Sequence, residues 1–214
     1  MTARFLYAHG FASGPQSTKG RALAAHFAAG GRGLQLLDLR VPDRNRLRLS
    51  AMIEVVRSAI GEGERAIAIG SSLGGLTCAR AAERDARIVG VFLIAPAFRI
   101  NERWPTRMGK EQWARWEREG VMPFPDYAIK GGTLDVDFGF IEDAGRVDGD
   151  GFPDLRVPTV IVHGQRDETV DPELSRTFAR GRSNVKLIEL DDDHQMIASI
   201  PTISRELDAF IDSL

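Results

Sequence analysis

Short runs of apolar residues recur along the chain, separated by longer stretches in which apolar positions follow a helical period. The apolar runs cover residues 4–8, 34–39, 66–69, 88–94, 159–163 and 185–190. They are nearly continuous rather than alternating, which is typical of strands buried on both faces of a parallel sheet. Helical periodicity covers residues 17–29, 49–60, 74–85, 172–180 and 201–214. This alternation predicts an α/β fold, with a doubly wound, mostly parallel sheet of about six strands.

The alternation of strand and helix stops between residues 97 and 158. Residues 110–119 predict a short amphipathic helix, and the remainder of this segment, which is rich in Pro, Gly and Asp, is predicted to be irregular. So long an interruption in a compact domain is usually functional. We therefore interpret residues 97–158 as a lid-like cap inserted into a single domain that spans residues 1–214.

The inserted segment contains all three tryptophans of the chain, Trp104, Trp113 and Trp116. Ligand pockets are mostly apolar, with a few polar groups that orient the ligand. We expect these tryptophans to line a small apolar substrate pocket above the sheet. The alternative is that they fill a separate core beneath the insertion.

Residues 70–74 read Gly-Ser-Ser-Leu-Gly, follow an apolar strand and open a helix. This is the context of the G-x-S-x-G nucleophile elbow, in which the serine lies on a sharp turn between a strand and a helix. The spacing selects Ser72 as the nucleophile and leaves Ser71 as its neighbour. The alternative is a glycine-rich turn whose serine only caps the helix.

A nucleophilic serine needs a base, and the base needs an acid that orients it. Asp167 and His194 follow the last two predicted strands, so both emerge at the same sheet edge as Ser72. Their order along the chain, serine, acid and then histidine, is the order expected for this motif. Asp171 is the alternative acid, but it is better explained as a helix N-cap before a proline. His163 at a strand end is expected to be a hydrogen-bonded structural residue rather than the base.

Acyl transfer also needs two amide donors for the oxyanion. The amide of Leu73, directly after the nucleophile, is one candidate. The second is expected in the loop after the first strand, where Phe11 is the predicted donor. His9 is then a structural residue that holds this loop through backbone hydrogen bonds.

The composition narrows the classes of function. The chain has 214 residues and a formal net charge of −2, which offers no broad basic surface for nucleic acid. A single cysteine, Cys78, excludes an internal disulfide and suits a reducing compartment. With neither a signal peptide nor a membrane span, we expect a cytoplasmic protein that does not bind membranes. No His or Cys cluster has metal-ligand spacing, and residues 148–151 are interpreted as a turn, too short for a calcium loop.

The motifs taken together resemble the α/β-hydrolase superfamily. The resemblance rests on Tyr-Ala-His-Gly-Phe at residues 7–11, the serine motif at residues 70–74, His-Gly-x-x-Asp at residues 163–167, and His194. The small size and the early His-Gly-Phe are similar to the compact YqiA/YcfP-like esterases of that superfamily. The resemblance implies a serine esterase or thioesterase that needs no cofactor and acts on a small-molecule ester.

The sequence therefore predicts a serine hydrolase that cleaves small carboxylic esters through an acyl-enzyme. A thioesterase or a peptidase that uses the same three residues stays open. A ligand-binding member of the fold without catalysis is the alternative from a different class.

Overall fold

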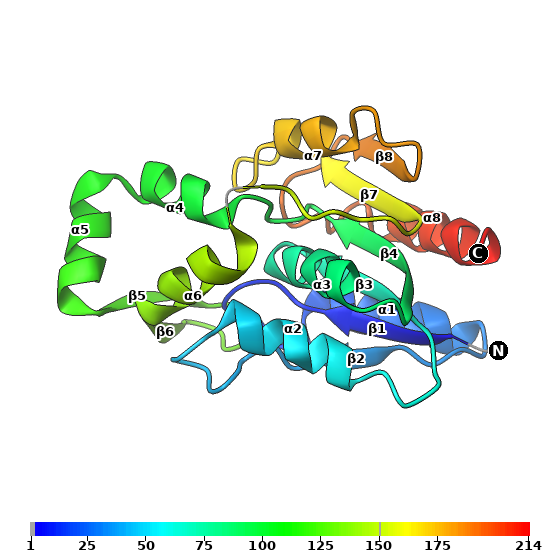
Figure 1. Cartoon of the computed structure of the whole chain (residues 1–214), viewed down its shortest axis with the longest axis horizontal. Helices are drawn as coiled ribbons and strands as arrows, with labels where there is room; N and C mark the ends of the chain where they lie inside the picture. Colours follow the sequence, from blue (N-terminus) through cyan, green and yellow to red (C-terminus); the bar gives the residue numbers. More distant parts are fainter. Residues whose placement is uncertain (1–2, 150) are drawn as a thin grey trace.

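The computed structural model describes residues 3–149 and 151–214, and within them six strands form one parallel sheet (Figure 1). They are β1 (Arg4–Ala8), β2 (Gln35–Leu37), β3 (Ala66–Ser71), β4 (Ile88–Ile94), β7 (Thr159–Gly164) and β8 (Val185–Leu190). Their order across the sheet is β2-β1-β3-β4-β7-β8, and every neighbouring pair is parallel. The predicted fold class and the number of strands are confirmed.

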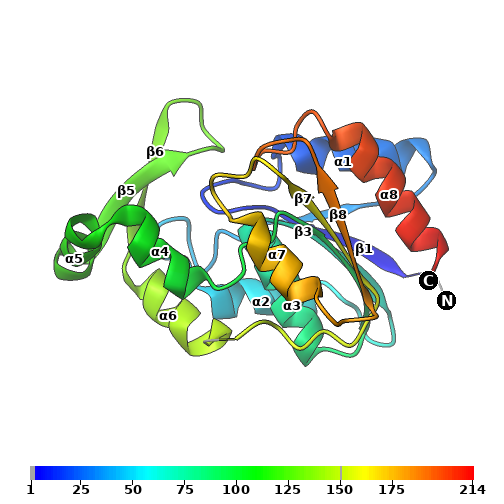
Figure 2. The same ribbon diagram turned by 90° about the horizontal axis from the view of Figure 1, so that it is seen from above.

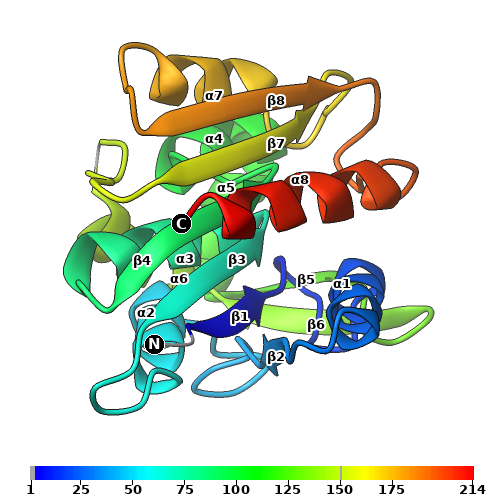
Figure 3. The same cartoon turned by 90° about the vertical axis from the view of Figure 1, so that its right-hand side faces the viewer.

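Helices cover both faces of this sheet, as Figure 2 and Figure 3 show. On one face lie α1 (Thr18–Ala29) and α8 (Ile200–Asp212), and on the other lie α2 (Leu49–Ser58), α3 (Leu73–Arg84) and α7 (Pro172–Ala179). Alternate residues of each strand belong to the two resulting cores; in β4, Leu93 belongs to one core and Phe92 to the other. This double burial explains why the strands appear in the sequence as continuous apolar runs.

The chain order of the strands reverses direction next to β1. From β1 the chain moves outward to β2, and then returns to β3 on the opposite side of β1. Ligands in open α/β sheets bind outside the carboxyl ends of the strands at such a switch point. The loop after β1 and the turn after β3 therefore meet where a site is expected.

The insertion between β4 and β7 is folded and lies beyond the carboxyl ends of the strands (Figure 1). It contains α4 (Ile100–Met108), α5 (Lys110–Glu119), the antiparallel strands β5 (Val121–Asp126) and β6 (Gly132–Asp137), and α6 (Gly139–Asp148). The helix predicted at residues 110–119 is confirmed as α5. The remainder, which the sequence predicted as irregular, contains α4, β5, β6 and α6, and for these elements that prediction was wrong.

Prolines account for this error. Pro123 and Pro125 lie in β5, and Pro105 lies inside α4. Because residues two apart in a strand direct their backbone nitrogens the same way, both missing N–H groups of β5 lie along one edge of the ribbon. A two-stranded ribbon has such an unpaired edge, so β5 tolerates residues that would break a central strand.

Three carboxylates connect the second half of the insertion to α2 and α3. They form the pairs Arg48–Asp137, Ser50–Asp143 and Arg80–Asp148, with contacts between 2.7 and 2.9 Å. Asp148 is buried, and the carboxylate that the sequence placed in a turn is an ion-pair partner at the end of α6. Asp150, in the same predicted turn, lies outside the described residues. No helix in the described part of the chain combines the length and apolarity that crossing a bilayer requires.

Trp116 is the centre of the aromatic core of the insertion. Its side chain is fully buried, and its indole nitrogen donates a hydrogen bond of 2.9 Å to the carbonyl oxygen of Val136. Trp113 is only partly buried and packs edge-on against Trp116 and Phe138. The fold of the insertion therefore depends far more on Trp116 than on Trp113.

We expect Trp116→Ala to lower the free energy of unfolding by roughly 3–5 kcal/mol, because it opens a large cavity and leaves the Val136 carbonyl without its donor. Urea unfolding followed by circular dichroism measures this change. Trp113→Ala is the matched control and should cost clearly less. Equal losses for the two variants would contradict this account of the core.

Candidate active site

Ser72 occupies a strained turn between β3 and α3. Its backbone has φ 55° and ψ −116°, a conformation that side-chain-bearing residues rarely adopt. A β-carbon on Gly70 would overlap the carbonyl of Gly74, and one on Gly74 would overlap the carbonyl of Ala8. Only glycine therefore fits at these two positions of the motif. The turn presents Ser72 at the amino-terminal end of α3, which carries a partial positive charge.

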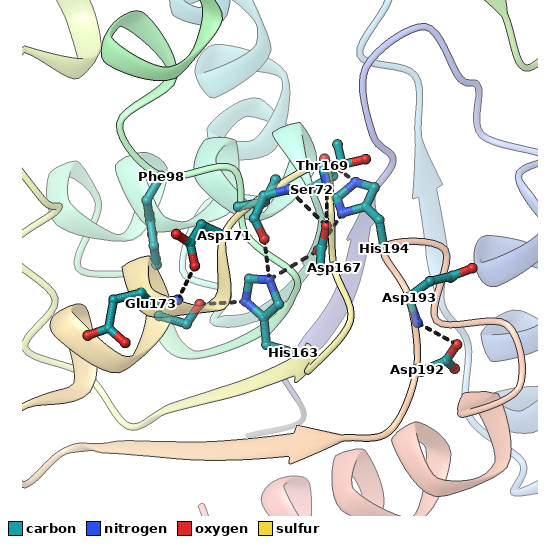
Figure 4. A network of polar contacts seen from close by, with 12 residues as sticks. Ser72, Phe98, His163, Asp167, Thr169, Asp171, Glu173, Asp192, Asp193 and His194 are labelled. Atoms are coloured by element: carbon teal, nitrogen blue, oxygen red, sulfur yellow. Dashed lines mark hydrogen bonds and ion pairs between the residues drawn. The ribbon is translucent and has the colours of Figure 1, made fainter. Parts of the chain in front are cut away.

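The three residues predicted as a catalytic triad lie within hydrogen-bond distance of one another (Figure 4). The Ser72 hydroxyl is 3.1 Å from Nε2 of His194. On the other side of the ring, Nδ1 of His194 is 2.7 Å from Oδ2 of Asp167. Asp167 comes from the loop after β7 and His194 from the loop after β8. The arrangement can take a proton from the serine and hold it on the imidazole.

Four donors surround the Asp167 carboxylate. Oδ1 accepts hydrogen bonds of 2.8 Å from the amides of Thr169 and Val170, while Oδ2 accepts from His194 and, at 3.1 Å, from His163. Burial opposes ionisation, but the hydrogen bonds from the two histidines and the Val170 amide outweigh it and hold the pKa of Asp167 well below its usual range. A carboxylate that stays charged requires Nδ1 of His194 to carry the proton, which leaves Nε2 free to act as a base.

His163 has the hydrogen-bonded structural role that the sequence predicted, and one of its partners, which the sequence prediction did not name, is Asp167. It is fully buried, and its Nε2 is 3.1 Å from Asp167 and 3.0 Å from the carbonyl oxygen of Val170. Its Nδ1 is 2.7 Å from the hydroxyl of Ser175 on α7. Both partners of Nε2 are acceptors, so that nitrogen donates and Nδ1 accepts. The spacing His-Gly-x-x-Asp held the signal, since it places the histidine at the strand end directly below the acid.

Asp171, the alternative acid, caps α7 as expected. Its Oδ1 accepts a hydrogen bond of 2.8 Å from the amide of Glu173. Figure 4 shows Asp171 next to α7 and apart from His194. Its carboxylate is therefore engaged by the helix.

The loop after β1 passes directly over Ser72. His9 accepts a 3.0 Å hydrogen bond from the Leu39 amide on Nε2, while Nδ1 donates to the carbonyl of Gly10 at 2.9 Å. Burial lowers the pKa of His9, which favours this neutral form, and the predicted structural role is confirmed. The missing side chain of Gly10 faces Ser72. Among the described residues, neither the Phe11 amide nor the Leu73 amide has an acceptor, so both are available to an oxyanion.

A cavity of about 560 Å³ opens above Ser72 and His194. Its volume lies inside the range of roughly 300–1,000 Å³ that small-molecule sites occupy. Trp104 lines it together with Phe11 and Phe124. Trp113 and Trp116 do not line it, which corrects the expectation that all three tryptophans bind substrate. Their rings fill the core of the insertion instead, as the alternative held.

The cavity is also more polar than the sequence predicted. Lys19, Arg103 and Arg107 belong to its lining, and none of them was identified as a candidate site residue. The spacing of the two arginines, four apart on α4, places them on one helix face and was the available signal. Within residues 3–149 and 151–214, no group of three or more His, Cys, Asp or Glu side chains is placed to hold a metal ion.

Nearly the whole chain matches one protein family. Residues 4–212 match the model of a family described as Uncharacterised protein family (UPF0227). The chain belongs to this family. The match covers the sheet, the insertion and all three residues predicted as a triad. No curated protein matches the chain.

Solved structures resemble the UPF0227 chain over its whole length. Mouse alpha/beta hydrolase domain-containing protein 10 has a TM-score of 0.80 and 21% identity, covering 100% of this chain and 91% of its own. Est1E from Butyrivibrio proteoclasticus has a TM-score of 0.70 and 19% identity, covering 98% and 88%. The esterase domain of a Rhodothermus marinus protein has a TM-score of 0.65 and 20% identity, covering 97% and 85%. These likenesses establish the α/β-hydrolase fold that the motifs predicted.

We expect Asp167→Asn to lower kcat for ester hydrolysis by roughly 10⁴-fold, because the amide favours the wrong tautomer of His194 and no longer stabilises the imidazolium. Asp171→Asn is the matched control, since asparagine caps a helix about as well as aspartate. Steady-state kinetics on a 4-nitrophenyl ester measures both. The reverse ranking would assign the acid to Asp171.

His163 is expected to act as a positioning residue for Asp167. His163→Leu should lower kcat by roughly ten- to a hundredfold with little change in KM, because a misplaced acid misorients the base. His163→Gln retains an amide donor and should recover part of this loss. Rates are normalised to the fraction labelled by a fluorophosphonate, so loss of folded protein does not enter. If His163→Leu left kcat per labelled site unchanged, His163 would contribute only to packing and not to the position of Asp167.

Proposed function

We propose that the protein is a serine hydrolase that cleaves small carboxylic esters through an acyl-enzyme on Ser72. The observation that carries this proposal is the continuous series of hydrogen bonds from Ser72 through His194 to Asp167. A protein that only binds a ligand has no need of such a series. A strained serine backbone beside two amides that have no acceptor among the described residues is a further argument for acyl transfer.

In the first half of the reaction, Oγ of Ser72 attacks the ester carbonyl while Nε2 of His194 takes the hydroxyl proton. A C–O bond forms, and the carbonyl electron pair moves to oxygen as an oxyanion. The amides of Phe11 and Leu73 donate to this oxygen, as expected from the sequence. The intermediate then collapses and expels the alcohol, which receives the proton from His194.

In the second half, water attacks the acyl-serine. Nε2 of His194 takes a proton from this water, and the oxyanion forms again between the same two amides. Collapse releases the carboxylic acid and returns the proton to Oγ of Ser72. Asp167 stays charged throughout and stabilises the imidazolium that is present in both halves.

The cavity supports a small-molecule substrate. Its volume of about 560 Å³ and its aromatic wall of Phe11, Trp104 and Phe124 suit an ester of modest size. A thioester would pass through the same steps, with a thiol as the leaving group, and an amide would place a harder demand on His194 as the acid. A panel of 4-nitrophenyl esters, acyl thioesters and aminoacyl anilides separates these three substrate classes.

Replacement of the nucleophile is the decisive experiment. We expect Ser72→Ala to lower kcat by about 10⁶-fold while the protein stays folded, and a fluorophosphonate to label Ser72. Ser71→Ala is the matched control, because Ser71 is the adjacent serine but its side chain is buried at the end of β3. Label on Ser71, or ester turnover that survives Ser72→Ala, would refute the proposal.

A further inference from the structure

The cavity above Ser72 has an unusual balance of charge. Its lining contains the cations Lys19, Arg103 and Arg107, and within the described residues it contains no Asp or Glu. The whole chain carries a formal charge of −2, so this excess of positive charge is a property of the cavity and not of the protein. Clefts lined by charge of one sign attract ligands of the opposite sign.

Arg103 and Arg107 are held side by side. They lie one turn apart on α4, and Nη1 of each donates to the carbonyl oxygen of Thr169, at 3.1 Å and 2.9 Å. Arg103 is further fixed by a 2.8 Å hydrogen bond from Nε to the carbonyl of Phe98. Thr169 is adjacent to the acid, since its amide donates to Asp167 (Figure 4). Two guanidinium groups are thus oriented beside the triad.

Neither of these arginines forms an ion pair with a carboxylate in the described part of the chain, whereas Arg99, the N-cap residue of the same helix, pairs with Glu102. Like charges four residues apart repel each other and destabilise a helix. Arg103 is also half-buried, and burial together with the nearby Arg107 lowers its pKa to about 10. Its Nη2 has no acceptor among the described residues. Repulsion between the two charges, burial of Arg103 and an Nη2 group without an acceptor in this part of the chain all destabilise the protein. An anion bound between the two guanidinium groups would offset all three effects.

Lys19 adds a third positive charge at another part of the wall. Its ammonium donates a 2.7 Å hydrogen bond to the carbonyl of Gln195, the residue after His194. Burial lowers its pKa to about 8, against the opposing effect of Asp167, Asp192 and Asp193. Lys19 is therefore mostly protonated at neutral pH and increases the positive potential of the cavity.

We propose that the preferred substrates are esters that carry a second group, an anionic carboxylate, bound by Arg103 and Arg107. Guanidinium groups bind carboxylates through paired, charge-assisted hydrogen bonds, which gives orientation as well as affinity. The Thr169 carbonyl holds both groups at a set position relative to Asp167, and so relative to Ser72. This inference rests on the proposed ester hydrolysis and names its substrate class.

Two matched pairs of substrates test the inference. Mono-4-nitrophenyl adipate is compared with 4-nitrophenyl hexanoate, which has the same acyl length without the charge, and the spontaneous rates are subtracted. For the alcohol half, 3-carboxyphenyl acetate is compared with phenyl acetate. We expect kcat/KM to favour the anionic member of at least one pair by about tenfold or more, and this preference to weaken with added salt.

Variants then locate the anion-binding groups. Arg103→Gln and Arg107→Gln should each lower the ratio of kcat/KM for the anionic ester to that for the neutral ester by about tenfold. Arg99→Gln is the matched control, at the N-cap of the same helix and outside the cavity lining, and should leave the ratio unchanged. If the arginines only support the Thr169 loop, both esters lose rate equally and the ratio stays constant. An unchanged ratio in both variants, or no preference in the unmodified protein, would overturn the inference.

Binding to Ser72→Ala separates this inference from the proposed function. Calorimetry measures the affinity of this variant for mono-4-nitrophenyl adipate and for 4-nitrophenyl hexanoate. The difference between the two affinities depends on the arginines and does not depend on the role of Ser72 as a nucleophile. We expect tighter binding of the adipate, and loss of that difference in Ser72→Ala with Arg107→Gln. Equal binding of both esters would overturn the inference while ester hydrolysis at Ser72 could still stand.

Discussion

Close backbone contact at the start of α3 is the constraint on which the site depends. Gly74 lies against the carbonyls of Ala8 and His9, and Gly70 lies against Gly74. These contacts set the distance between the turn that carries Ser72 and the loop that carries Phe11. The proposed nucleophile and the expected oxyanion donors are therefore positioned by main-chain atoms, which shift far less than side chains. Backbone strain at Ser72 persists because β3, which leads into the turn, is buried along its whole length and holds the turn in place.

The charged and polar groups of the site are arranged around the Asp167 carboxylate. Two amides of its own loop and two histidines from different elements bind one carboxylate. The amides close the loop, His163 joins it to β7 and α7, and His194 joins it to the nucleophile. A single buried anion thus determines the shape of a loop, the tautomer of the base and the placement of Thr169. The arginines of α4 attach to this loop from outside, through Thr169.

The sheet could be predicted because each of its central strands is buried on both faces, which leaves a continuous apolar run in the sequence. The places of Ser72, Asp167 and His194 could be predicted because the carboxyl ends of parallel strands share one edge of a sheet. The insertion could not be predicted in the same way. Proline is a strong signal for a loop, and only the pairing of β5 with β6 shows why Pro123 and Pro125 are tolerated.

Side-chain contacts that form only in the tertiary structure could not be predicted from the sequence either. Arginines four apart are common on helices, and what distinguishes Arg103 and Arg107 is that neither forms an ion pair with a carboxylate of the described residues. The burial of Trp116 and the exposure of Trp104 to the cavity differ for a similar reason. Both lie on helices of the insertion, and the direction in which each helix packs decides which ring faces the cavity.

Phe11 belongs to two parts of the molecule at once. Its amide lies in the loop over Ser72, while its ring packs against Trp104, Phe124 and Phe140, with ring centroids 5.0–5.6 Å apart. The insertion and the oxyanion loop consequently form one mechanical unit, although some ninety residues separate them in the chain. A chimera that exchanged the insertion between relatives would disturb catalysis as well as specificity, unless residue 11 and its aromatic neighbours were transferred together. Substitutions in the insertion that alter the substrate pocket would, for the same reason, also shift the Phe11 amide above Ser72.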